Sequence, residues 1–193
     1  MTTMTPLTQL EFQILDWIVR TFHHEILDAY APTISFLGDY GWIWIVIALL
    51  FMIRKSSRKV GVTILLALAF SHIVADIALK PFVARLRPYD INTAYQLLID
   101  PPAGFSFPSG HTQSAFAAAA AINHSNKIIG SGALLLAAAI GFSRLYLYVH
   151  FPGDVLAGAA IGLLIGGIAD TLITEIRYRH YSQRRRKLKQ SRP

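Results

Sequence analysis

Residues 143–154 read Ser-Arg-Leu-Tyr-Leu-Tyr-Val-His-Phe-Pro-Gly-Asp, and apolar residues run from 128 to 149 and from 155 to 173. Each apolar run has about the length, roughly 20 residues, that a helix needs to cross about 30 Å of hydrocarbon. The two runs therefore predict a pair of membrane helices joined by a polar turn. An arginine at membrane depth is costly unless it is paired or faces a cavity, so Arg144 predicts a polar site beside this turn.

The composition of the whole chain also indicates a membrane protein. Of its 193 residues, 53% are hydrophobic and 15% are charged, and the mean hydropathy is +0.43. A soluble domain usually has about 25% charged residues. The chain has no cysteine, which excludes disulfides and thiolate chemistry. The net charge of +7 is concentrated after Ile176, where eight Lys or Arg residues and no acidic residue occur.

Five apolar spans can be identified along the chain, and the first and third are short. The first can be extended backward through residues 31–37, and the third through Ser109. Short spans are tolerated where neighbouring helices cover them. The five spans are Gly41–Ile53, Val60–Leu79, Thr112–Ile122, Ile128–Val149 and Val155–Ile173.

The N-terminal segment Leu7–Leu27 has apolar residues at helical spacing on one face and charged residues on the others. We interpret it as an amphipathic helix at the membrane interface, with a sixth spanning helix as the alternative. The sequence thus predicts an all-α, polytopic membrane helix bundle of five or six transmembrane helices plus this N-terminal helix. We expect one domain over residues 1–193, with an amphipathic segment at 1–30 and a basic cytoplasmic tail at 176–193.

The loop charges predict the orientation. Basic residues lie between spans one and two (54–59), between spans three and four (Lys127), and after span five. These positions share one side if each span crosses once, and positive loops stay in the cytoplasm. Residues 80–108 and the turn at 150–154 then lie on the other side of an integral membrane protein.

Three short motifs lie on or just beneath that second side. Lys80 and Arg87 form the pattern K-x6-R-P, and a continuing helix would present both on one face about 10 Å apart. Residues 108–111 read Pro-Ser-Gly-His before an alanine-rich helical run. Ser109 suits an N-cap, Gly110 allows close approach of the backbone, and free N–H groups at a helix start bind phosphate.

The third motif, S-R-x5-H-x3-D, brings a histidine and a carboxylate to one turn. A carboxylate near one ring nitrogen of His150 fixes the tautomer and stabilises the imidazolium. The other ring nitrogen is then free to attack phosphorus. Taken singly, each motif has a simpler interpretation: cations that contact lipid head groups, a capped helix, or an interfacial histidine beside an Asp154 N-cap.

Together, in number and order, the motifs resemble the phosphatase signature of the type 2 phosphatidic acid phosphatase superfamily. The resemblance covers residues 80–154 closely and the flanking helices only in layout. It implies a metal-independent lipid phosphatase without a cofactor, and the motifs contain only one carboxylate, which is a poor site for a hard cation. Three fixed cations can supply the charge neutralisation that Mg²⁺ supplies elsewhere.

The resemblance also implies a role for each motif residue. His150 corresponds to the nucleophile, Asp154 to the carboxylate that orients it, and His111 to the general acid for the leaving oxygen. The residues expected to bind the phosphoryl group are Lys80, Arg87, Ser109, Gly110 and Arg144.

Three charged residues outside the motif positions, Asp76, Arg85 and Asp170, also need an interpretation. His72, Asp76 and Lys80 recur at intervals of four residues, so we expect Asp76 to support the site by pairing with Lys80, with a purely structural helix contact as the alternative. Arg85, inside the spacer of the first motif, is considered as a contact for a second phosphate. Asp170, within span five, has no evident partner in the sequence.

The expected function is dephosphorylation of a membrane lipid phosphate or diphosphate through a phosphohistidine. The resemblance to bacterial members favours conversion of undecaprenyl diphosphate to undecaprenyl phosphate, on the extracytoplasmic side of a bacterial plasma membrane. Phosphatidylglycerol phosphate and phosphatidic acid are the alternative substrates. A lipid-binding or lipid transport protein is the non-enzymatic alternative, and the hydropathy argues against a soluble vanadate haloperoxidase.

The expected partners are the lipid substrate and the bilayer, and we expect no nucleic acid, since a basic tail after a span suits anionic lipid. The sequence does not define the oligomeric state.

Overall fold

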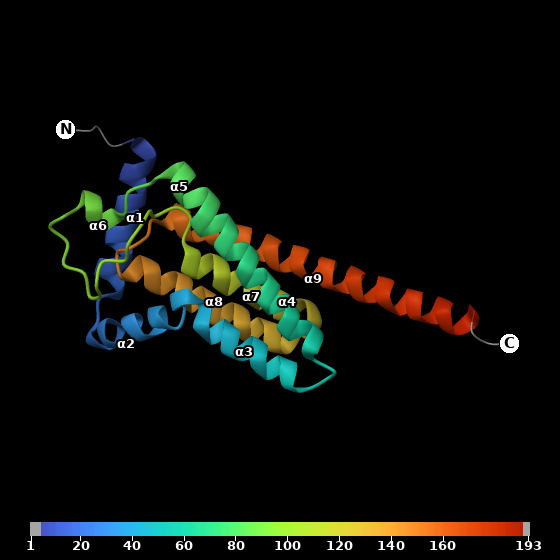
Figure 1. Cartoon of the computed structure of the whole chain (residues 1–193). Coiled ribbons are helices and arrows are strands. Elements are labelled where there is room, and N and C mark those ends of the chain that lie inside the picture. The colour runs from blue at the N-terminus through green and yellow to red at the C-terminus, as the bar shows by residue number, and fades with distance from the viewer. Residues whose placement is uncertain (1–4, 191–193) are drawn as a thin grey trace.

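The protein is described by a computed structural model that covers residues 5–190 (Figure 1). Throughout this range the regular elements are helices, which confirms the all-α class. In chain order they are α1 (Pro6–Phe22), α2 (Glu25–Phe36), the 3₁₀-helix η1 (Asp39–Gly41), α3 (Trp42–Ile53), α4 (Arg58–His72), the π-helix η2 (Ile73–Leu79), α5 (Lys80–Val83), α6 (Pro88–Ile91), α7 (Gly110–Ser125), α8 (Lys127–Tyr146) and α9 (Pro152–Gln190).

Three helical stretches of this range are long and apolar enough to cross a membrane: Arg58–Ile91, Lys127–Tyr146 and Pro152–Gln183. The pair Glu25–Phe36 and Asp39–Ile53, bent by 50°, forms a fourth if it is counted as one span. The protein is therefore an integral membrane protein by its apolar helices, with three to four candidate spans. The expected five or six crossings exceed this number because α7 has only 16 residues and α1 is amphipathic.

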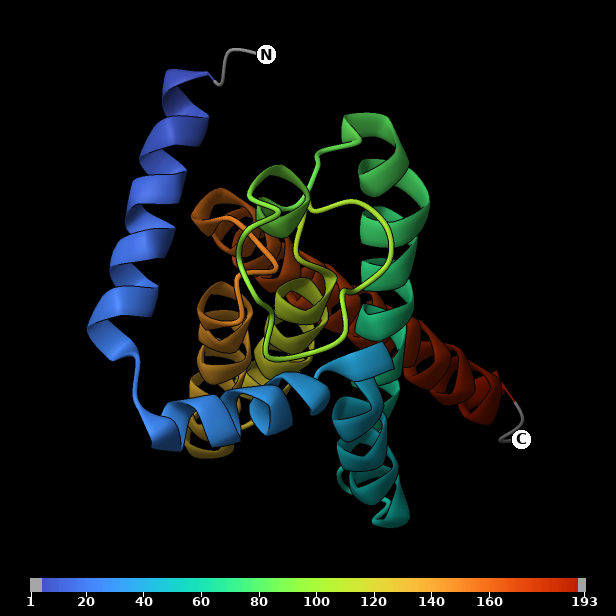
Figure 2. The same cartoon turned by 90° about the vertical axis from the view of Figure 1, so that its left-hand side faces the viewer.

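Helix α7 lies inside the bundle, against α4, α8 and α9 (Figures 1 and 2). Its alanines at 115 and 117–121 are buried, and three glycines of α9, spaced four residues apart at 158, 162 and 166, face it. A Cβ atom at Gly162 would lie 2.4 Å from the main-chain oxygen of Gln113. Small residues at such an interface let two backbones approach closely, which fixes α9 against the start of α7.

The N-terminal segment departs from the predicted helix Leu7–Leu27. Helix α1 ends at Phe22, and Nδ1 of His24 accepts the N–H of Ile26 at 3.2 Å to begin α2. The histidine pair at 23–24 thus divides the segment, because a side-chain cap competes with a continuing helix. In the view of Figure 2, α1 and α2 border the loops that cover one end of the bundle.

Two further boundaries differ from expectation. The helix that carries Lys80 ends at Val83, Ala84 adopts a left-handed conformation with φ of 48°, and Pro88 opens α6 rather than ending a helix. Lys80 and Arg87 therefore do not share a helical face. At the other end, α9 continues as a helix to Gln190, so residues 176–190 of the predicted tail 176–193 are helical, and residues 191–193 lie outside the described range.

Asp170 on α9 has a partner that the sequence did not reveal. Its Oδ1 lies 2.7 Å from Nζ of Lys59, at the start of α4. The ion pair joins two helices far from the loops that cover the bundle, and it explains how an acidic residue is accommodated within a span.

We predict that Gly162→Ala lowers the free energy of unfolding by about 1–3 kcal/mol, because the added methyl group forces α9 away from α7. Gly132→Ala on α8 is the matched control: a Cβ there meets no atom of the described residues within 4 Å, so that variant should be neutral or more stable by roughly 0.5–1 kcal/mol. Thermal unfolding in detergent measures both. Equal midpoints for the two variants would contradict the close α7–α9 contact.

Candidate active site

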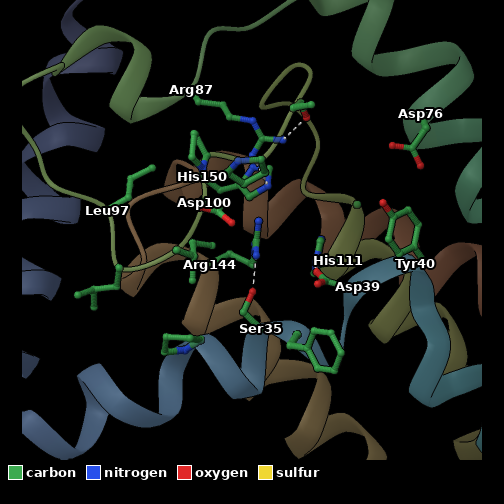
Figure 3. Close-up of a pocket in the computed structure, with 18 of the residues that line it drawn as sticks. Ser35, Asp39, Tyr40, Asp76, Arg87, Leu97, Asp100, His111, Arg144 and His150 are labelled. Carbon is green, nitrogen blue, oxygen red and sulfur yellow. Dashed lines mark hydrogen bonds and ion pairs between the residues drawn. The ribbon is translucent and has the colours of Figure 1, made fainter.

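A cavity of ≈1250 Å³ opens at the end of the bundle where α2, η2 and α7 meet the turn after α8 (Figure 3). Segments separated by more than 60 positions in the sequence contribute to its walls. Among the residues that line it are Lys80, Arg87, Gly110, His111, Arg144 and His150, together with Asp76. The structure therefore brings six of the predicted site residues and the expected supporting carboxylate to one cavity.

His150 is buried and carries its free lone pair on the nitrogen nearest Arg87. Its Nε2 lies 3.2 Å from Nη1 of Arg87, and because a guanidinium only donates, Nε2 accepts and the ring proton lies on Nδ1. Burial lowers the pKa of His150 to about 3. The imidazole is therefore neutral at physiological pH, as a nitrogen nucleophile must be.

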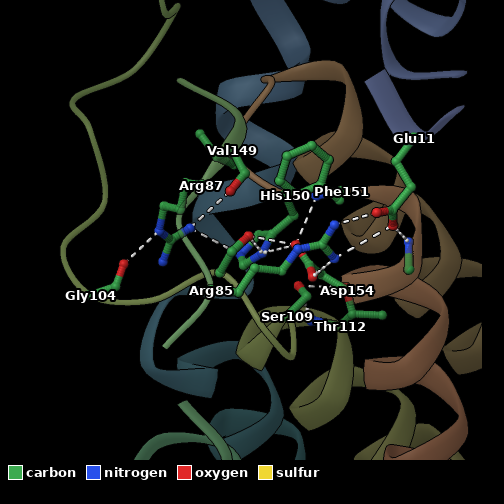
Figure 4. A network of polar contacts seen from close by, with 12 residues as sticks. Glu11, Arg85, Arg87, Gly104, Ser109, Thr112, Val149, His150, Phe151 and Asp154 are labelled. Atoms are coloured by element: carbon green, nitrogen blue, oxygen red, sulfur yellow. Dashed lines mark hydrogen bonds and ion pairs between the residues drawn. The ribbon is translucent and has the colours of Figure 1, made fainter. Parts of the chain in front are cut away.

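Asp154 lies on the opposite side of the imidazole from Arg87 (Figure 4), where Ser106 also contacts Nδ1 of the ring. Nδ1 of His150 is 3.6 Å from Oδ2 of Asp154 and 3.4 Å from Oγ of Ser106. The Ser106 hydroxyl in turn donates to the same Asp154 oxygen at 2.5 Å, and the N–H of Phe151 donates to it at 2.8 Å. Asp154 thus lies within ion-pair distance of His150 and is linked to its Nδ1 through the hydroxyl of Ser106.

Ser106 did not emerge from the sequence analysis. It has no motif of its own, and its only signal is a polar residue two positions before Pro-Ser-Gly-His. The loop must fold back onto α9 before its hydroxyl reaches Asp154, and the N–H of Ser106 donates to the carbonyl of Arg85 at 2.8 Å to hold it there.

Arg87 is held by main-chain carbonyls rather than by carboxylates. Its guanidinium donates to the carbonyls of Gly104, Val149 and Ala103 at 2.9, 3.0 and 3.2 Å. The side chain therefore joins the covering loop, which connects α6 to α7, to Val149, the residue before His150. Among the described residues no carboxylate pairs directly with its guanidinium, so its positive charge is left for an anion in the cavity.

Arg144 is also buried, and one of its donors is unused. Its Nη1 donates to Ser35 on α2, whereas Nε has no hydrogen-bond partner within residues 5–190. A buried donor without a partner costs about 1–3 kcal/mol. A phosphoryl oxygen in the cavity could accept from this N–H, so the donor set suits an anionic ligand.

Lys80 lies between Asp76 and the start of α7. Its Nζ is 2.5 Å from Oδ1 of Asp76, whose other oxygen is 2.9 Å from Nδ1 of His72. A Cβ atom at Gly110 would be 3.5 Å from the ammonium group, so the cation sits beside the free N–H groups of the α7 N-terminus. The expected Asp76–Lys80 pair is present.

His111 pairs with a carboxylate that the sequence analysis missed. Its Nε2 is 2.6 Å from Oδ1 of Asp39 in η1. Asp39 lies 72 positions earlier, in a turn without a recognisable motif, so only the fold reveals the contact. A carboxylate at this distance stabilises the imidazolium form and opposes the larger effect of burial, which disfavours that charge.

Ser109 has a structural position in this arrangement. Its hydroxyl caps α7 by accepting the N–H of Thr112 at 3.4 Å, and its own N–H donates to the carbonyl of Asp154 at 3.1 Å. The side chain is buried and lies outside the cavity lining, so its expected contact with phosphate stays a prediction.

The cavity walls carry three cations, Lys80, Arg87 and Arg144, and three carboxylates, Asp39, Asp76 and Asp100. Nowhere in residues 5–190 do three His, Asp or Glu side chains gather as a metal site would require. Lys80, Arg87 and Arg144 can instead stabilise the equatorial oxygens of a phosphoryl group, whose transfer depends mainly on positioning and charge stabilisation.

Comparisons with known proteins agree with this geometry. The sequence pattern of the PAP2 superfamily matches residues 59–177. The chain is 32% identical over 130 residues to an undecaprenyl-diphosphatase of Sulfolobus acidocaldarius, covering 66% of this chain and 63% of that relative. It is 32% identical over 145 residues to a decaprenylphosphoryl-5-phosphoribose phosphatase of Mycobacterium tuberculosis, covering 75% and 79%.

A solved structure shares the fold. The PAP2 type phosphatidylglycerolphosphate phosphatase from Bacillus subtilis superposes with a TM-score of 0.73 at 24% identity, over 90% of this chain and 89% of that chain. At this identity the likeness concerns the arrangement of helices.

We predict that His150 stays neutral down to pH 5, because its pKa of about 3 lies below the ordinary value of 6.5. The ¹⁵N chemical shifts of histidine-labelled protein in detergent would show this, with the His150 signals assigned by their loss in His150→Asn. A titration midpoint above pH 5 for those signals would contradict the buried, desolvated imidazole.

Proposed function

Because the chain belongs to the PAP2 superfamily, we propose that it is a lipid phosphatase that forms a phosphohistidine on His150 without a metal ion. One observation carries the proposal: His150 lines the same cavity as Lys80, Arg87 and Arg144, and its Nε2 lies 3.2 Å from Nη1 of Arg87. A neutral nucleophile thus faces three cations that can hold a phosphoryl group in line with it.

In the first step, the Nε2 lone pair attacks phosphorus and forms the N–P bond as the bond to the leaving oxygen breaks. The proton on Nδ1 stays on the Asp154 side, where the carboxylate stabilises the positive charge of the substituted imidazole. His111, paired with Asp39, gives its proton to the leaving oxygen. Acid catalysis of this kind contributes about 10²–10⁴-fold.

In the second step, water attacks phosphorus and the N–P bond breaks. Neutral His111 now takes a proton from the water, and the electron pair returns to Nε2 of His150. Inorganic phosphate leaves, and His111 is protonated again for the next cycle. Both steps use the same cations, so no group has to be repositioned between them.

For the substrate, we propose undecaprenyl diphosphate, which would give undecaprenyl phosphate and phosphate. Support comes from the Sulfolobus relative, named an undecaprenyl-diphosphatase, and from the Mycobacterium relative, named for a decaprenyl lipid. The alternatives are phosphatidylglycerol phosphate, after which the structural neighbour is named, and phosphatidic acid. The cations recognise the phosphoryl group that all of these lipids share.

For the membrane arrangement, we propose five crossings within a single domain of residues 1–193. Helix α7 would complete the candidate spans, with α1 at the interface. The basic connection near residues 54–59 and the end of α9 would face the cytoplasm, and the cavity would face outward from a bacterial plasma membrane. Labelling of single introduced cysteines from each side of intact cells tests this orientation, since the chain has no cysteine of its own.

The function is tested by phosphate release from purified protein in detergent with EDTA present. We expect undecaprenyl diphosphate to be hydrolysed faster than phosphatidylglycerol phosphate or phosphatidic acid. His150→Ala should abolish release because the nucleophile is lost, and EDTA should have no effect because cations of the protein hold the phosphate. A faster rate on another lipid would correct the substrate, whereas full activity in His150→Ala would exclude the phosphohistidine.

A second prediction concerns Asp39. Asp39→Asn removes the negative charge that favours protonated His111, so the general acid should lose its proton at lower pH. We expect the basic limb of the kcat/KM profile to move to lower pH, and kcat at pH 8 to fall about tenfold. Asp100→Asn, another carboxylate on the cavity wall, is the control. A profile identical to that of wild type would show that Asp39 does not act on the general acid.

A further inference from the structure

A buried carboxylate on α1 stands out among the groups outside the cavity. Helix α1 exposes Leu7, Leu10 and Trp17, yet Glu11 on the same helix is only 6% exposed. Its carboxylate accepts hydrogen bonds from both Nη atoms of Arg85, and Oε1 also accepts the N–H of Gly153 at 2.9 Å. Such burial is costly unless the charge is paired and hydrogen-bonded, and here both conditions hold.

Arg85 connects this carboxylate to Asp154, the carboxylate beside His150 (Figure 4). Its Nη1 also donates to Oδ1 of Asp154 at 2.7 Å, and its guanidinium carbon lies 4.1 Å from the centroid of the Phe151 ring. Arg85 is therefore engaged behind His150 and does not line the cavity, which differs from the contact with a second phosphate considered from the sequence.

Helix α1 also contacts residues that precede and follow His150 in the sequence. The ring of Phe12 meets that of Phe151 edge-on with centroids 5.0 Å apart, and the hydroxyl of Tyr148 donates to Oδ1 of Asp16 at 2.7 Å. A Cβ atom at position 153 would lie 2.5 Å from Oε1 of Glu11. The turn that carries the nucleophile is thus completed by a helix that lies outside the matched range 59–177.

We propose that Glu11 and Arg85 are positioning residues that hold Asp154 in place behind His150. The proposal rests on the proposed function and adds α1 to the site. Glu11 accepts hydrogen bonds from both Nη groups of Arg85, so only Nη1 also donates to Oδ1 of Asp154. Without the charge of Glu11, the guanidinium can turn both Nη groups toward Asp154 and draw it away from Ser106 and His150.

The test compares Glu11→Gln with Glu25→Gln, the same chemical change at an exposed position of α2. We expect kcat to fall about 10- to 100-fold in Glu11→Gln, since small misplacements of catalytic groups cost this much, and to stay at the wild-type value in Glu25→Gln. The competitive inhibition constant of inorganic phosphate should change by less than about twofold, because the interactions lost are not those that bind the ground state.

A double-mutant cycle identifies the residue through which Glu11 acts. If Glu11 works through Asp154, adding Glu11→Gln to Asp154→Asn should cost little further activity. An equal loss in both backgrounds, or a kcat of Glu11→Gln equal to that of Glu25→Gln, would overturn the proposal. So would a parallel weakening of phosphate inhibition, which would indicate a general distortion of the cavity.

The ¹⁵N signals of His150 give a readout that does not depend on turnover. They should shift in Glu11→Gln and not in Glu25→Gln, and unshifted signals would overturn the positioning role. If wild-type protein releases no phosphate, the proposed function fails and these signals alone decide the positioning. Should Glu11→Gln unfold, Arg85→Lys keeps the charge but loses the two-pronged geometry, and wild-type kcat in that variant would overturn the proposal.

Discussion

Two buried guanidinium groups have to be accommodated at the end of an apolar bundle, and much of the site follows from this requirement. Neither arginine can lose its charge inside the protein. Arg87 is satisfied by the carbonyls of the covering loop and of Val149, and Arg144 by Ser35 on α2. Each set of bonds ties a segment to the site, the loop between α6 and α7 in one case and α2 in the other, so the bonds that satisfy the charges also help to build the cavity walls.

The packing of small residues brings the two halves of the site together. Because α9 approaches α7 closely through its glycines, the first turns of both helices lie side by side. The N–H of Ser109 then reaches the carbonyl of Asp154, and the Pro-Ser-Gly-His motif meets the turn of His150. A feature of the helix interface, with no chemistry of its own, thus sets the spacing between the candidate general acid and the nucleophile.

The sequence predicted the parts of this site that have a local pattern. The apolar periodicity indicated membrane helices, and the three motifs named the cations, both histidines and Asp154. It did not predict Ser106, Asp39, Glu11 or the role of Arg85, because each acts through a partner distant in the sequence. The helical link between Lys80 and Arg87 was wrong for a related reason: the chain leaves the helix at Ala84 so that Arg87 can reach Val149. Local propensity does not contain such tertiary requirements.

Helix α9 has a length that matters beyond the site. Its 39 residues extend about 58 Å at 1.5 Å per residue, nearly twice the roughly 30 Å of hydrocarbon. Its first turn carries Asp154, and its last turns emerge at the opposite end of the molecule (Figure 1). A spectroscopic label near the far end of this rod would therefore stand clear of the lipid while reporting the tilt of the helix that holds the carboxylate.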